Sequence, residues 1–145
     1  LVTFIRGLTP DLQQMIAAGF GLPDELFRSW LRALYTVRNI CAHHSRVWNR
    51  ELGVKPLLPG KNKHPDWHIQ PAIPNARVGI VLTICYFWLG KITSTTKWRS
   101  RLLSLFDDFP EIPLNSMGLP DSWRLHPLWT ESSGNIASQH TSATP

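Results

Sequence analysis

The sequence predicts an all-α protein, and three observations carry this prediction. Apolar residues recur at intervals of three and four in the clearest stretches, which is the period of an α-helix. Helix-start signals precede these stretches, and clustered prolines fall between and after them. The chain has 145 residues, of which 43% are hydrophobic, so it is long and apolar enough for one domain, or part of one, with a core.

The first predicted helix opens at the stretch "TPD". Thr9 is in an N-cap position, Pro10 suits the first turn, and Asp11 lies near the positive end of the helix dipole. The helix is expected to run to about Ala18 and to end at the glycines of residues 19–21. Helix-like sequence also begins almost at the first residue, Leu1.

The second predicted helix has the strongest local pattern in the chain. The stretch "PDE" at 23–25 repeats the start signal, and apolar residues then recur at helical spacing. The predicted buried stripe consists of Phe27, Trp30, Leu31, Leu34, Val37 and Cys41.

A long basic loop is predicted from Glu51 to Pro74, because five prolines are spaced there too closely for regular structure. Asn75 is then expected to cap a third helix through about Thr93. The apolar run 78–92 within it covers about fifteen residues, short of the ~20 that a membrane span needs. We therefore expect a buried core helix and no membrane partner.

A fourth helix is predicted at 97–109. Its expected apolar side consists of Trp98, Leu102, Leu105, Phe106 and Phe109. Residues 110–129 have apolar anchors between prolines without a period, which predicts an extended strap over the helices. Residues 131–145 turn to Ser, Thr, Gly and Asn, so we expect one domain over 1–130 and a disordered tail after it.

Positive charge is concentrated in one part of the sequence. The net charge is +5, and the window from residue 28 to residue 63 holds a single acid, Glu51. Its basic residues are Arg28, Arg32, Arg38, Arg46, Arg50, Lys55, Lys61 and Lys63. Such a window favours a polyanionic partner such as nucleic acid, although a merely solvated basic face is the alternative.

The cysteines and histidines predict neither a disulfide framework nor a metal site. Cys41 and Cys85 are far apart, which suits a reducing cytoplasm. Cys41 is too close to the histidine pair 43–44 for the usual four-ligand zinc arrangements, and Pro65 separates His64 from His68. We expect no metal, no cofactor and no signal peptide.

The stretch "RNICAHHSRVWNR" at 38–50 is the candidate site. At 100° per residue, Arg38 falls about 40° from the centre of the buried stripe, and about 140° from His43. Asn39 and His43 are one turn apart on the other side. Either the helix ends or bends near residues 41–45, or two copies of the chain pool their side chains.

Such a cationic site suits cleavage of RNA by its own 2′-hydroxyl. An imidazole that titrates near neutrality moves the proton, and an arginine stabilises charge on the phosphate oxygens, with no metal required. The alternative is structural: Arg38 makes a salt bridge, and His43 and His44 are ordinary surface residues.

The wider string "LRALYTVRNICAHHSRVWNRELGVKP" resembles the Abi-like family of bacterial abortive-infection proteins, related to the AbiD and AbiF phage-resistance proteins. The stretches "GLPDELFRSWLRAL" and "FPEIPLNSMGLPDSWRLHPLW" resemble the same family. The resemblance runs from about Leu1 to Trp129. Family members are usually about twice this long, so the chain resembles their C-terminal half.

This family is similar to the HEPN superfamily, whose helical bundles carry an Arg-x4-6-His motif that forms a metal-independent endoribonuclease site, commonly across a dimer. The resemblance implies Arg38 as phosphate stabiliser, Asn39 as positioning residue and His43 as general acid or base, with His44 as a secondary candidate. It also implies pairing of two HEPN units, and an antitoxin is a further candidate partner.

The expected function is a cytoplasmic phage-defence effector that cuts RNA. The basic loop is expected to hold the RNA backbone, with Trp48 and Trp67 as stacking candidates or core residues. Its expected contact residues are Arg46, Arg50, Lys55, Lys61 and Lys63. The alternative function is a non-catalytic HEPN module that binds RNA or a protein.

Overall fold

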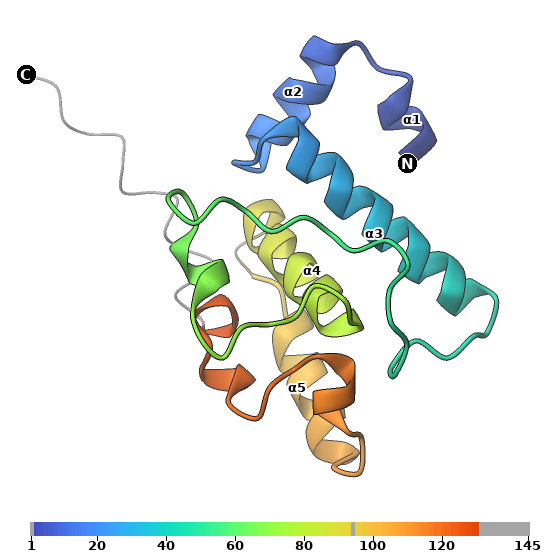
Figure 1. Ribbon diagram of the computed structural model, residues 1–145, viewed down its shortest axis with the longest axis vertical. Helices are drawn as coiled ribbons and strands as arrows, with labels where there is room; N and C mark the ends of the chain where they lie inside the picture. Colours follow the sequence, from blue (N-terminus) through green and yellow to red (C-terminus); the bar gives the residue numbers. More distant parts are fainter. Residues whose placement is uncertain (1, 94, 131–145) are drawn as a thin grey trace, which may run out of the picture.

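A computed structural model describes residues 2–93 and 95–130 and confirms the all-α class, since no strand occurs within these ranges (Figure 1). The elements are α1 (Val2–Arg6), α2 (Pro10–Gly19), α3 (Asp24–Ala42), η1 (Pro65–His68), α4 (Val78–Ile92), α5 (Trp98–Asp108), η2 (Leu114–Met117), η3 (Trp123–Leu125) and η4 (Pro127–Trp129), where η denotes a 3-10 helix. The tail predicted to be disordered, 131–145, lies outside the described residues.

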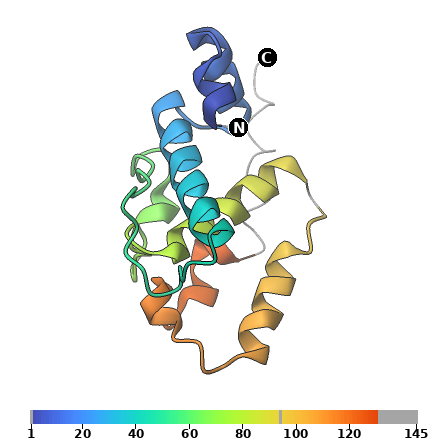
Figure 2. The same ribbon diagram turned by 90° about the vertical axis from the view of Figure 1, so that its right-hand side faces the viewer.

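The long axis of the molecule separates the first helices from the last. In both views α1 and α2 lie at one end and α5 lies at the other, with α3 and α4 between them (Figure 1, Figure 2). Helix α3 packs against α1, α2 and α4. Its C-terminal end projects toward the edge of the molecule (Figure 1).

The bounds of α2 and α3 confirm the predicted helices. Thr9 occupies the N-cap position of α2, but its side chain makes no capping hydrogen bond. The helix ends where Gly21 takes a left-handed conformation with φ 70°. On α3 the predicted stripe is buried only at Phe27, Trp30 and Leu31.

Helix α4 is the centre of the fold, as its continuous apolar sequence predicts. Six of its first seven residues are buried, one of them a glycine. The predicted Asn75 cap is wrong, because the Asn75 amide instead donates to the Pro56 carbonyl at 3.2 Å. No helix in the described part of the chain has both the length and the apolar character needed to cross a bilayer.

Two aromatic clusters meet at α4. The first joins α2, α3, η1 and α4, and consists of Phe20, Phe27, Trp30, Trp67, Phe87 and Trp88. The second joins α4, α5 and the C-terminal turns, and consists of Tyr86, Trp98, Phe106, Trp123 and Trp129. Phe87 of α4 belongs to the first cluster and the adjacent Tyr86 to the second, so α4 connects the N-terminal helices with the C-terminal turns.

The long loop between α3 and α4 is confirmed, with η1 as its short helical turn. It folds back along α3, since the Trp30 indole donates to the Leu57 carbonyl at 2.8 Å and the Ser29 hydroxyl accepts from the Leu57 amide. The Leu52 amide donates to the Ala76 carbonyl at 2.8 Å, which brings the two ends of the loop together. This loop is therefore a fixed part of the fold.

The C-terminal region departs from prediction in two ways. On α5 only Phe106 is buried, while Leu105 and Phe109 are exposed, so the expected apolar side is wrong at these two positions. The segment after Pro110 packs over the helices as expected, but it forms three 3-10 turns and not an extended strap. Its buried anchors are Met117, Leu119, Trp123, Leu128 and Trp129.

Candidate active site

The end of α3 places the candidate residues. The helix closes with a Schellman turn: the His44 amide donates to the Cys41 carbonyl and the Ser45 amide donates to the Ile40 carbonyl, both at 3.0 Å. His43 is the C-cap, and its amide donates to the Asn39 carbonyl at 3.0 Å. The helix therefore ends within the predicted range 41–45.

His44 adopts a left-handed conformation, with φ 54°. Glycine is usual at this position of a Schellman turn, because a Cβ atom crowds the backbone there. The turn therefore carries two adjacent exposed imidazoles, those of His43 and His44.

Arg38 and Asn39 make a direct contact, in which the Arg38 guanidinium donates to the Asn39 side-chain oxygen at 3.0 Å. Asn39 and His43 are one turn apart and linked through their backbones. The hydrogen bond therefore turns the Arg38 head group toward the face that carries His43. This contact brings the Arg38 head group closer to His43 than the angle of about 140° on a straight helical wheel predicts. Within the described residues, no hydrogen bond joins Arg38 to His43 itself.

Arg38 does not lie in the core, which corrects the prediction from the helical wheel. Arg38 and Cys41 fall in line with the buried stripe but are exposed, because the last turn of α3 extends beyond the elements that cover the stripe. Among the described residues no carboxylate pairs with Arg38. The structural salt bridge considered as an alternative is therefore not found there.

The basic loop residues divide into two groups. Arg46 and Arg50 are exposed and directly follow the Schellman turn. Lys61 and Lys63 are also exposed, but they follow Leu57, whose amide donates to Ser29 in the first part of α3, away from the helix end. The structure therefore keeps only the first pair beside the histidines.

Lys55 is the fifth predicted contact residue, and a carboxylate already neutralises it. Its ammonium group contacts Glu51 at 2.7 Å. The hydrogen bond and charge of Lys55 lower the pKa of Glu51, so this acid stays ionised.

The two tryptophans considered for base stacking have different environments. Trp67 is 4% exposed and packs on Trp30, with ring centroids 4.9 Å apart, so it is a core residue and not a stacking platform. Trp48 is 38% exposed, between Arg46 and Arg50 in the sequence. Of the two indoles, that of Trp48 is therefore placed to meet a base.

Two histidines of the loop between α3 and α4 take part in the packing of that loop. His68 bonds the Pro59 carbonyl at 2.7 Å, and burial lowers the pKa of His64. Both cysteines are free thiols. Within the part of the chain that the structure describes, no three His, Cys, Asp or Glu side chains gather in a way that would hold a metal ion.

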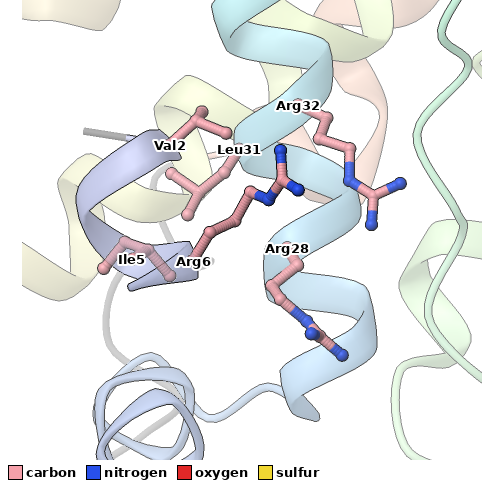
Figure 3. Close-up of a pocket in the computed structure, with 6 residues that line it drawn as sticks. All are labelled: Val2, Ile5, Arg6, Arg28, Leu31 and Arg32. Carbon is pink, nitrogen blue, oxygen red and sulfur yellow. The ribbon is translucent and has the colours of Figure 1, made fainter. Parts of the chain in front are cut away.

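A pocket of about 380 Å³ lies between α1 and α3, and the sequence analysis did not identify it. Its lining is Val2, Ile5, Arg6, Arg28, Leu31 and Arg32 (Figure 3). The i, i+4 spacing of Arg28 and Arg32 was a visible signal, but Arg6 reaches them only through the packing of α1 on α3. A local pattern does not contain that packing.

The fold and site define an all-α protein with an Arg-Asn-His cluster exposed at a helix end beside a basic segment. The family model described as "Abi-like protein" matches residues 1–49, so this part of the chain is similar to that family. The match covers the whole cluster from Arg38 to His44. Searches of curated proteins and of solved structures found no match.

Proposed function

We propose that this protein is a phage-defence effector that cleaves RNA at Arg38, Asn39 and His43, without a metal, on a HEPN-like helical bundle. The observation that carries the proposal is the hydrogen bond from Arg38 to Asn39, which turns an exposed guanidinium toward the helix face of His43. An arginine without a carboxylate partner keeps its donors for a phosphate. The family match supports phage defence as the setting.

The proposed reaction needs one base, one acid and one stabiliser of negative charge. His43 takes the proton of a ribose 2′-hydroxyl, and that oxygen attacks the adjacent phosphorus. The bond to the 5′ oxygen breaks, a protonated imidazole gives that oxygen its proton, and a 2′,3′-cyclic phosphate remains. Arg38 stabilises the charge on the non-bridging oxygens while Asn39 holds the guanidinium.

The acid in this scheme comes from a second copy of the chain, with His44 as a secondary candidate. One His43 cannot be both deprotonated as base and protonated as acid in the same step. The last turn of α3 offers an uncovered continuation of the apolar stripe at Cys41 and beside the half-buried Val37. Pairing of two such turns would cover this surface and bring two imidazoles together.

The RNA strand is proposed to approach along the segment after the Schellman turn. Arg46 and Arg50 contact phosphates, and Trp48 stacks on an unpaired base. Lys55, Lys61 and Lys63 contribute only long-range attraction, because Lys55 is paired with Glu51 and the other two follow the return of the loop along α3.

The test is to incubate the purified chain with total RNA in excess chelator and to compare the wild type with His43→Ala and Arg38→Ala. Wild type is expected to produce ends with 2′,3′-cyclic phosphate, and His43→Ala is expected to lose at least roughly a hundredfold in rate. His44→Ala tests the secondary candidate for the acid, and it should keep most of the activity if a second copy of the chain supplies the acid.

Both variants should unfold at the wild-type temperature. Arg38 and His43 are exposed, so each change should alter the free energy of unfolding by no more than about 0.5 kcal/mol. Equal cleavage by wild type and His43→Ala would refute the site. RNA that is retained but left intact by every variant would instead favour a non-catalytic binding module.

A further inference from the structure

We propose that the pocket between α1 and α3 is a phosphate subsite for the RNA strand that reaches His43, an inference that rests on the proposed function. Arg6 projects from α1 toward α3, while Arg28 and Arg32 come from successive turns of α3 (Figure 3). Aliphatic side chains form the rest of the lining. Its volume, about 380 Å³, lies in the range of sites for small ligands or for one unit of a larger one.

The arginines of this pocket are short of anionic partners. Arg28 contacts Asp24 at 2.8 Å and donates to the Gln13 side chain at 3.4 Å. In the described residues neither Arg6 nor Arg32 pairs with a carboxylate. Asp24 offsets the charge of Arg28, and a bound phosphate would offset the charges of Arg6 and Arg32.

A second observation points to a missing acceptor. The Arg28 Nε–H is buried and has no hydrogen-bond partner in the structure. An unsatisfied buried donor destabilises a protein unless a ligand or water accepts from it. The Asp24 Oδ1 is also unsatisfied, but Asp24 does not line the pocket. Arg28 therefore has an unused donor next to the pocket that it lines.

The pocket and the candidate active site share one face of α3. At 100° per residue, Arg28, Arg32, Asn39 and His43 fall within a narrow sector of the helix. At 1.5 Å per residue, Arg32 and His43 are about 16 Å apart along the axis. A stacked strand rises about 3.4 Å per nucleotide, so roughly five nucleotides connect the two sites. An RNA oligomer must therefore span about five nucleotides to contact both sites, so the dependence of affinity on oligomer length tests the proposal.

The test measures binding of 2′-O-methyl RNA, which the proposed reaction cannot cleave, by fluorescence anisotropy. The probes are oligomers of two and of eight nucleotides. Arg6→Gln/Arg32→Gln is the test variant, because both residues are exposed and Arg28 keeps its contacts with Asp24 and Gln13. Lys97→Gln/Arg101→Gln is the control, since it removes the same charge from exposed positions around the start of α5.

The test variant should bind the octamer roughly tenfold or more weakly than wild type at about 0.1 M salt, with a shallower salt dependence. The affinity of the test variant for the dinucleotide should stay unchanged. The affinity of the control variant for the octamer should also stay unchanged. Three results would overturn the subsite: wild-type affinity of the test variant for the octamer, equal losses of affinity in the test and control variants, or wild-type binding of the dinucleotide that is as tight as that of the octamer.

Cleavage assays on ordinary RNA separate this inference from the proposed function. The test variant should raise KM and keep kcat, whereas His43→Ala should abolish kcat. A wild type that does not cleave, together with octamer binding that depends on Arg6 and Arg32, would refute only the ribonuclease. If the wild type cleaves RNA and the test variant cleaves it with the same KM and kcat, only the subsite would be refuted.

Discussion

His44 takes a backbone conformation that a side chain disfavours, and it does so within the proposed site. A left-handed conformation costs roughly 1–2 kcal/mol for a residue with a Cβ atom. Such conformations are frequent where a functional side chain must be held in one place. Here the turn fixes the direction in which the chain leaves α3, and therefore the position of the exposed His43.

Replacing His44 with glycine should stabilise the protein by roughly 0.5–1 kcal/mol, because relief of the strained Cβ exceeds the added freedom of the unfolded chain. Urea denaturation measures this difference. His44→Ala retains the Cβ and should show no gain. If the alanine variant were stabilised as much as the glycine variant, the imidazole and not the backbone would be the source of strain.

The two thiols should react at very different rates. Cys41 is exposed, whereas burial raises the pKa of the Cys85 thiol to about 11. Since the thiolate is the reactive form, we expect iodoacetamide to label Cys41 and to spare Cys85 near neutral pH. Mass spectrometry of tryptic peptides measures both sites. Cys41→Ser is the control, and preferential labelling of Cys85 in the wild type would contradict the packing of α4.

At the scale of elements, the approach of α4 to η2 depends on two glycines. A Cβ atom on Gly79 would lie 2.8 Å from the Met117 carbonyl oxygen and 2.9 Å from that of Gly118. Gly118 has φ 83°, and a Cβ there would lie 2.6 Å from the Arg77 Cβ. Neither position has room for a side chain, because Gly79 packs on the backbone of residues 117–118 and Gly118 packs on the side chains of Arg77 and Pro74.

Gly79→Ala should therefore destabilise the protein by about 1–3 kcal/mol, despite the higher helix propensity of alanine. Thermal and urea denaturation both report this loss. Gly53→Ala is the control, because a Cβ at Gly53 meets no atom within 4 Å. A stabilised Gly79→Ala variant would mean that α4 and η2 are not in contact.

Local signals in the sequence predict the elements well where the signals are strong. The start of α3 at Asp24 agrees with two acids in the first turn, and the end of α2 agrees with the backbone freedom of Gly21. The Asn75 cap fails because the Pro56 carbonyl, nineteen residues away in sequence, binds its amide. Contacts of this kind depend on the tertiary fold and leave no local pattern.

The sequence proposed the residues of the candidate site but not their geometry. The helical wheel and the family resemblance pointed to Arg38, Asn39 and His43, whose role stays a prediction, yet periodicity placed Arg38 on the buried side. Periodicity reports which side of a helix a residue lies on, whereas burial also requires a neighbouring element. Within residues 2–93 and 95–130, no element buries Arg38 or Cys41 in the last turns of α3. The pocket at Arg6 was missed for the same reason.

For the whole molecule, acid should weaken the fold through His64. Burial lowers its pKa below the ordinary value of 6.5, as do the charges of Lys91 and Lys63, while Asp66 acts in the opposite direction. The unfolded chain therefore binds a proton more readily than the folded chain. Stability should begin to fall as the pH drops below about 6.5 and stop falling below the folded pKa.

His64→Gln should remove this part of the pH dependence. Urea denaturation of both proteins between pH 8 and pH 5 gives the two profiles, which should be parallel at the alkaline end and diverge below about pH 6.5. Identical profiles over the entire range would show that His64 is as accessible to protons in the folded protein as in the unfolded one.

Of the seven tryptophans, all of which the structure describes, only Trp48 is exposed to solvent. It lies close in sequence to the candidate site. Indole fluorescence shifts to longer wavelength in water, so the red edge of the emission spectrum belongs largely to this one residue. The protein therefore carries an intrinsic optical probe of the segment that follows α3. Its emission reports events at that segment without any dye, while the blue side of the same spectrum reports the integrity of the two aromatic clusters.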